Sequence, residues 1–268
     1  MMISIVDGRY ERLLALVTEW RVRVDCTVHE LQSAIGRLRH VCYVVREGVS
    51  FLGHLIRLTR HHVNRNDTIV VTERARAGFA WFADFLPRFR CRPISDCDWD
   101  QPAHFHIVAD ACLTGYGAYN YEREEYVCGE WSQEILQSAD RRVSISMPFL
   151  EGLCLTVAQL VWLPYLENRR VVLVSDCEPF VKAARRQYST DECMLELLQA
   201  LAMMRAVNNV SVRYDHVSTT DNIVDELSRG DVQAFLRRCP SKAPCKVTSP
   251  LLQARSWRDA LAKYWMRR

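Results

Sequence analysis

The spacing of hydrophobic positions changes near residue 104, and this change divides the chain into two regions. In the first region, apolar residues recur at helical spacing over residues 9–58 and again over 77–86. A short β-like run at residues 69–71 separates the two stretches. We therefore expect residues 1–87 to form a small helical region.

Local signals support the boundaries of this region. Thr27 stands three residues before Glu30, and this spacing predicts a capping box at the start of a helix. Pro87 follows the last apolar helix pattern. Residues 88–103 then combine several proline, serine and aspartate residues, a composition typical of a linker.

Residues 104–238 have the mixed pattern of an α/β domain. In chain order, the expected elements are strands at 105–112, 118–121 and 126–131, a helix at 148–163, a strand at 170–175, helices at 178–186 and 191–207, a strand at 210–214 and a helix at 222–228. Short turns join the first three strands, which predicts an antiparallel meander, whereas the fourth is a continuous apolar run typical of a buried parallel strand. The expected fold is a five-stranded mixed sheet, three antiparallel strands and then two parallel ones, flanked by helices.

Composition is ordinary for a globular protein, and the net charge of +3 does not by itself predict a polyanionic partner. The charge is unevenly distributed, however, because Asp259 is the only acidic residue after Arg237 among many basic ones. Residues 239–268 are therefore expected to form a basic C-terminal tail. Such a tail suits a nucleic acid and is equally consistent with a solvated surface segment.

Cysteine usage and hydropathy limit the cellular setting. The eleven cysteines form no C-x-x-C pair and no zinc-finger spacing, which favours a reducing, intracellular compartment. Apolar runs long enough to cross a membrane are missing, and the first residues mix acids and bases where a signal peptide needs an apolar core. We expect no membrane association, and the sequence leaves nucleus and cytoplasm equally open.

Four carboxylates occupy different local contexts in the α/β region. Asp110 lies near the end of the first strand, Glu151 on the apolar side of the first long helix, Asp176 at the end of the fourth strand and Asp225 in the last helix. A charged group on an apolar strand has to be paired, lie near the sheet edge or bind a metal. The carboxyl ends of parallel strands are where α/β sheets place their sites.

Carboxylates gathered in this way are ligands for hard divalent cations. Two such ions about 4 Å apart can activate water and stabilise the leaving oxygen in phosphodiester hydrolysis. Each residue alone has an ordinary explanation, such as a turn-forming Asp or a solvated helical Glu. Their order on the expected elements favours a site for two Mg²⁺ ions, which Mn²⁺ can replace, and no small-molecule cofactor is indicated.

Five segments carry a family resemblance. They are DACLTGYGA from Asp110, SMPFLEGLC from Ser146, VLVSDC from Val172, NIVDELSR from Asn222 and, in the helical region, ELQSAIGRLRHVCYVV from Glu30. The first four resemble the DAS-x-x-GWGA, N-x-x-E-L-x-A, v-x-x-x-TDN and N-x-x-AD-x-LSR motifs of retrotransposon reverse transcriptase ribonuclease H domains, those of the DIRS type above all. The fifth is similar to the thumb that precedes such a domain.

The resemblance implies Mg²⁺-dependent cleavage of the RNA strand of an RNA–DNA hybrid. Asp110 would then bridge two ions, with Glu151 and Asp176 on one side and Asp225 on the other. Trp131 stands in the family's Gly-x-W position, where core packing is its expected role. The chain has no Y-x-D-D motif, so the polymerase palm and fingers are missing and the polymerase part of the element becomes a possible partner.

The sequence departs from the family at several places. Cys177 stands where Asn is usual and Val224 where Ala is usual. His216 lies near the position of an auxiliary His in cellular ribonucleases H, but in a loop without the usual Pro-Gly. A catalytically inactive nucleic-acid-binding remnant is therefore an alternative. A DEDD exonuclease is disfavoured, because that group needs D-x-E where this chain has Asp110-Ala-Cys112.

Arginines of the helical region are candidates for contact with nucleic acid. We expect Arg37, Arg39, Arg57 and Arg60 to bind phosphates, with an affinity that falls as salt rises. A solvated helix face explains the same pattern equally well. Sequence-specific binding is not expected, because hybrids are recognised by shape and 2′-hydroxyl groups.

Overall fold

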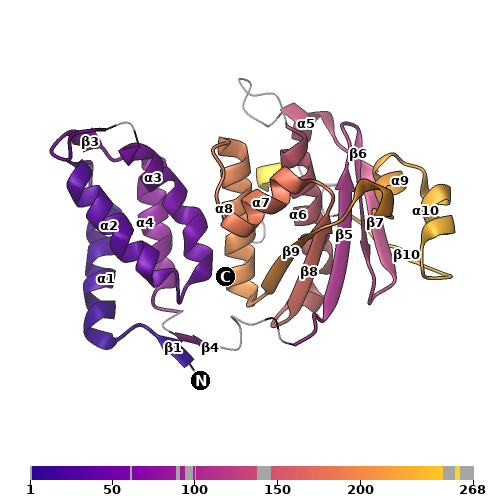
Figure 1. The fold of residues 1–268 in the computed structure, drawn as a ribbon, viewed down its shortest axis with the longest axis horizontal. Coiled ribbons are helices and arrows are strands. Elements are labelled where there is room, and N and C mark those ends of the chain that lie inside the picture. Colours follow the sequence, from indigo (N-terminus) through magenta and orange to yellow (C-terminus); the bar gives the residue numbers. More distant parts are fainter. Residues whose placement is uncertain are drawn as a thin grey trace. The chain divides into compact units, whose positions relative to one another are not determined.

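The computed structural model describes residues 2–60, 62–88, 91–93, 99, 101–137, 146–249 and 257–259. The chain divides into two compact units, Met1–Asp100 and Gln101–Arg268. Figure 1 shows the elements of both units.

The first unit is helical, as its pattern predicts. It contains α1 (Asp7–Trp20), α2 (Val28–Val41), the 3-10 helix η1 (Arg46–Leu52), α3 (Gly53–Thr59) and α4 (Glu73–Phe85). Antiparallel pairs join β1 (Met2–Ser4) to β4 (Cys91–Pro93) and β2 (Asp25–Thr27) to β3 (Thr68–Val70).

Aromatic rings form much of the core of this unit. Trp81 stacks on Phe51 with ring centroids 4.3 Å apart, and Trp20 packs against Phe79. The capping box predicted at Thr27 and Glu30 is confirmed: each side chain accepts a hydrogen bond from the other residue's backbone N–H. Strand β4 lies within residues 88–103, for which the sequence predicts a linker. Residues 89, 90, 94–98 and 100 of this linker lie outside the described chain.

The second unit contains the predicted mixed α/β sheet, which is confirmed. Its strands are β5 (Phe105–Ala111), β6 (Gly115–Asn120), β7 (Glu125–Glu130), β8 (Arg170–Ser175), β9 (Ser211–His216) and β10 (Cys245–Lys246). They lie in the order β10-β7-β6-β5-β8-β9. The meander β5-β6-β7 is antiparallel, and β8 is parallel to both β5 and β9.

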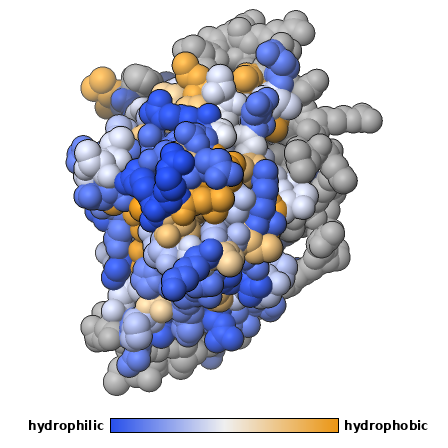
Figure 2. Space-filling model, turned by 90° about the vertical axis from the view of Figure 1, so that its right-hand side faces the viewer, coloured by the Kyte–Doolittle hydropathy of each residue, from blue (hydrophilic) through white to orange (hydrophobic). Residues whose placement is uncertain are grey.

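Helices cover both faces of this sheet. They are α5 (Gln133–Gln137), α6 (Met147–Leu166), α7 (Glu178–Arg186), α8 (Glu192–Asn208), the 3-10 helix η3 (Thr219–Asp221), α9 (Asp225–Ser228) and α10 (Val232–Arg238). In Figure 1, α6, α7 and α8 lie on one side of the strands and α9 and α10 on the other. Figure 2 views the α9–α10 side, whose surface is mostly hydrophilic with scattered hydrophobic groups.

Two hydrophobic clusters follow from this arrangement. The larger joins α6 and α8 to the strand residues Ile107 and Ala109, and the smaller joins α9 and α10 to Val108. Because successive side chains of a strand point to opposite faces, Asp110 shares the α9 face with Val108. Asp110 also lies near the carboxyl end of β5, a central strand that contacts α6.

Helix α6 is longer than the sequence predicts. The sequence pattern predicts its end at residue 163, just before Pro164, yet the helix continues to Leu166, which is buried in the larger cluster. A proline this close to the end of a helix removes only one late hydrogen bond, so packing of the last turn prevails. Helix α6 is long and apolar enough to cross a membrane. However, 78% of its most apolar 18-residue stretch is buried, as in the core helix of a folded domain.

The segment expected to be a basic tail is part of the fold wherever the structure describes it. Strand β10 extends the sheet beside β7, which makes six strands where five were predicted. Tyr116 donates a hydrogen bond to Ser249 over 2.7 Å, and Trp257 is buried against Phe149 of α6. The basic composition suggested a solvated segment, but Ser249 and Trp257 are buried and attach this segment to the domain.

Candidate metal centre

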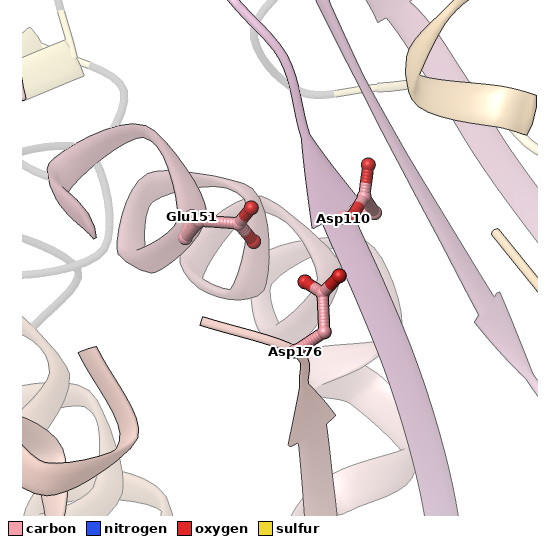
Figure 3. A group of neighbouring side chains, drawn as sticks. All are labelled: Asp110, Glu151 and Asp176. Atoms are coloured by element: carbon pink, nitrogen blue, oxygen red, sulfur yellow. The ribbon is translucent and has the colours of Figure 1, made fainter. Parts of the chain in front are cut away.

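Three of the four predicted carboxylates meet at one edge of the sheet. One oxygen each of Asp110, Glu151 and Asp176 can be chosen so that all three lie within 4.8 Å of one another. Figure 3 shows that the three carboxylates, from β5, α6 and the end of β8, point toward a common space. Asp110 and Glu151 are buried, with 4% and 5% of their surfaces exposed.

The parallel pairing of β5 and β8 accounts for two of these positions. Val108 lies opposite Val174, so two residues further along each strand the chain reaches Asp110 and Asp176 at the same edge. Glu151 reaches the same edge from α6. The neighbouring α6 residues Leu150 and Leu153 are buried in the larger cluster, so this side of the helix faces the sheet. The apolar face of the helix thus carries one carboxylate into the site.

Burial strongly perturbs the protonation of this site. The pKa of Asp110 is raised to about 7, first by burial and then by the charges of Asp176 and Asp225, although a Ser228 hydrogen bond and Arg229 both lower it. Burial, followed by the charges of Asp110 and Asp176, raises the pKa of Glu151 to about 9. The site therefore holds protons at neutral pH that a bound cation has to displace.

A serine residue supports one of the buried carboxylates. Ser175 is fully buried and donates a hydrogen bond to a Glu151 oxygen over 3.3 Å. The same hydroxyl accepts the backbone N–H of Cys177 over 3.1 Å, which fixes its orientation. Ser175 therefore links Glu151 to the backbone just beyond Asp176.

The loop before α9 brings an amide to the same site. Asn222 is fully buried and its Nδ2 donates a hydrogen bond to Asp110 Oδ1 over 3.0 Å. The sequence predicted a helix from 222 to 228, but α9 spans only Asp225–Ser228. Asn222 Oδ1 accepts the backbone N–H of Val224, so a side-chain turn replaces the first helical turn.

Asp225, the fourth predicted ligand, has a different environment. Among the residues that the structure describes, it does not belong to the close carboxylate group. Its oxygens accept hydrogen bonds from Arg229 Nε and Nη2 at 3.0–3.2 Å. Asp225 remains near enough for its charge to raise the pKa of Asp110.

His216 also lies beside the site. It is the last residue of β9, paired with Ser175 across the parallel ladder, and it is exposed. Its Nε2 lies 3.1 Å from the backbone oxygen of Asp176. The predicted auxiliary residue His216 thus contacts the backbone of Asp176 and not its carboxylate group.

The four predicted nucleic-acid-binding arginines belong to the first unit. Arg37 and Arg39 are exposed on α2, Arg57 is half-buried on α3, and Arg60 is exposed just after α3. They therefore divide into a pair on α2 and a pair at the C-terminal end of α3.

Trp131 has the packing role expected of it. It is buried against the ring of Tyr116, with centroids 4.6 Å apart. Its Nε1 donates a hydrogen bond to the backbone oxygen of Cys112, two residues after Asp110. The tryptophan thus holds the end of β5 that carries the first carboxylate.

Sequence reasoning missed the residues that orient the carboxylates. Ser175 immediately precedes Asp176 and Asn222 lies three residues before Asp225, so both stand inside the motifs already singled out. Small polar residues adjoining a predicted ligand are a usable signal for such supporting contacts. Their partners, however, come from other elements and become visible only in the fold.

The donor set fits a hard divalent cation. Oxygen ligands with several negative charges suit Mg²⁺ or Mn²⁺, and thiolates and imidazoles that would select zinc are not members of the close group. Burial first, and the neighbouring carboxylate charges after it, disfavour the ionised forms of Asp110 and Glu151, and a bound cation would offset both effects. Asp110, Glu151 and Asp176 are thus able to hold a metal ion.

Comparison with known proteins finds similarity among solved structures only. No protein-family model matches the chain, and no curated protein matches it. Among solved structures, it is similar to the N-terminal RNase H domain of Rv2228c from Mycobacterium tuberculosis, determined as a fusion with maltose-binding protein. That match has a TM-score of 0.33 and 12% identity, and it covers 50% of this chain and 98% of the other.

Proposed function

We propose that the second unit is a metal-dependent endonuclease that hydrolyses the RNA strand of RNA–DNA hybrids, the ribonuclease H part of a retrotransposon reverse transcriptase. The observation that carries the proposal is the convergence of Asp110, Glu151 and Asp176 at the carboxyl edge of a mixed sheet. The motifs around these residues add the substrate class and the retrotransposon context. The polymerase part of such an element is the proposed protein partner.

The three carboxylates and Asp225 would hold Mg²⁺, which when bound lowers the pKa of a coordinated water and stabilises the leaving oxygen. Asp110 is near both Asp176 and Asp225, since the charges of both raise its pKa. Ser175 and Trp131 keep Glu151 and the end of β5 in place. The rigid strands and α6 thus provide a preorganised set of oxygen ligands.

A second candidate function is nucleic-acid binding without turnover. The observation that favours it is the pairing of Asp225 with Arg229, which leaves three carboxylates in the close group. In that case the fold retains a hybrid-binding surface while a complete two-ion site does not form. Cleavage and binding therefore need to be measured separately.

Cleavage of a labelled RNA–DNA hybrid with Mg²⁺ or Mn²⁺ tests the proposal. We expect the wild-type chain to cut only the RNA strand and Asp110→Asn to abolish detectable cutting. Asp84→Asn is the matched control, because Asp84 is an exposed carboxylate on α4 of the other unit. Hybrid that is bound but not cut by the folded wild-type chain would decide for the second candidate.

A further inference from the structure

Asn222 is a fully buried amide whose donor group is directed at the central carboxylate. Its Nδ2 lies 3.0 Å from Asp110 Oδ1, and Asp110 itself is 4% exposed. The two residues are separated by 112 positions in the chain, so the contact is a product of the fold. A buried carboxylate oxygen that accepts a hydrogen bond from a fixed donor loses much of its rotational freedom.

The rest of Asn222 is anchored independently of Asp110. Its Oδ1 accepts the Val224 N–H over 3.3 Å, and its own backbone N–H donates to the Ser218 oxygen over 3.0 Å. These contacts satisfy the turn between η3 and α9. The remaining donor of the side chain is therefore not needed for the turn and goes to Asp110.

We propose that Asn222 is a positioning residue that orients the Asp110 carboxylate for binding of a divalent cation. This inference rests on the proposed function only in taking Asp110 as a metal ligand. A neutral amide is suited to the task, because it donates a hydrogen bond without bringing a positive charge that would repel the ion. Donors of this kind behind a metal ligand typically change metal affinity by about 10–100-fold.

Direct titration of the whole chain with Mn²⁺ by calorimetry tests this role without reference to cleavage. Asn222→Ser is the informative variant: a serine hydroxyl can accept the Val224 N–H in the same kind of turn but is too short to reach Asp110. We expect the dissociation constant for Mn²⁺ to rise about tenfold. The melting temperature without metal reports any loss of folding in the same sample.

Asn120→Ala is the matched control. Asn120 is also a fully buried asparagine of the second unit, at the end of β6 opposite Ile107, and its Oδ1 accepts the Arg123 N–H. This change should lower the melting temperature and leave Mn²⁺ affinity unaltered. Asn222→Ala, which removes the turn contact as well, should lower both the melting temperature and the affinity for Mn²⁺.

Two results would overturn the inference. One is a folded Asn222→Ser chain that binds Mn²⁺ as tightly as wild type, and the other is a wild-type chain that binds no Mn²⁺. A wild-type chain that binds Mn²⁺ and does not cut hybrid would contradict the proposed function instead, while a tenfold loss in Asn222→Ser would still support the role of Asn222.

Discussion

Arg229, which directly follows α9, forms a bidentate ion pair with Asp225 at the start of that helix. Its Nε lies 3.2 and 3.1 Å from the two carboxylate oxygens, and its Nη2 lies 3.0 Å from Oδ1. The guanidinium thus supplies positive charge to the one predicted ligand that stands outside the close carboxylate group. Since the Arg229 side chain is 65% exposed, the pair is weak and open to competition by a cation.

Arg229→Gln should therefore strengthen binding of a second divalent ion. Exposed pairs contribute about 0.2–1 kcal/mol, so we expect up to about a fivefold lower dissociation constant for that ion. Mn²⁺ titration followed by electron paramagnetic resonance resolves the number of ions and their affinities. Lys182→Gln, which breaks the exposed Lys182–Glu178 pair on α7, is the control and should change neither. Unchanged titrations for both variants would show that Asp225 takes no part in cation binding.

The metal-free second unit should lose stability as pH rises. The pKa values of Asp110 and Glu151 rise from 3.8 and 4.5 to about 7 and about 9 in the folded chain. The folded state therefore prefers their protonated forms, so this contribution is complete below about pH 4 and is lost as pH rises through 7 and 9. Melting temperatures between pH 5 and 9 should fall more steeply for wild type than for Glu151→Gln, which cannot ionise.

Mg²⁺ should reverse this loss, because a ligand that binds only the folded state stabilises it by mass action. We expect a larger rise in melting temperature on adding Mg²⁺ at pH 8 than at pH 5.5, where protons compete for the same oxygens. Equal rises at both pH values, or none, would contradict a site built from Asp110 and Glu151.

Gly117 is expected to be intolerant of a side chain, because α9 packs directly on it. An added Cβ would overlap Leu227 Cβ and meet backbone atoms of Leu227 and Ser228 at 3.0 Å. Gly117→Ala should therefore displace α9, destabilise the fold by about 1–3 kcal/mol and weaken metal binding. Urea unfolding and Mn²⁺ titration measure the two effects.

Gly36→Ala supplies the contrasting case. Gly36 lies inside α2, where nothing is within 4 Å of an added Cβ. Alanine there should stabilise the first unit by about 0.5–1 kcal/mol, because it favours helix over the unfolded chain. A similar destabilisation by both substitutions would show that close packing of α9 is not the cause at Gly117.

Binding of hybrid by the first unit should depend on the exposed α2 arginines. Each cation that contacts a phosphate contributes about one unit to the slope of log affinity against log salt. Replacing Arg37 and Arg39 by Gln should thus lower that slope by about two, as measured by fluorescence anisotropy from low to moderate NaCl. The same double change at Arg9 and Arg12, exposed on α1, is the control. Equal slopes for both variants would place the phosphate contacts elsewhere.

Local patterns were sufficient for most elements of the fold. Alternating and continuous apolar runs located the five main strands, and the Thr27–Glu30 spacing located a helix start, because both depend on residues close in the chain. The same runs placed Asp110 and Asp176 at strand ends. Their proximity to each other follows from the pairing of β8 with β5, and the sequence did not predict that strand order.

Contacts between distant segments were decided only by the tertiary structure. Asn222 reaches Asp110 across 112 positions, and Trp257 enters the core through a segment whose composition resembles a solvated tail. The pairing of Asp225 with Arg229 is local, yet its consequence depends on how far α9 lies from the close carboxylate group. Composition and periodicity report which face of an element is apolar, but which side chains complete a site depends on how separate elements pack together.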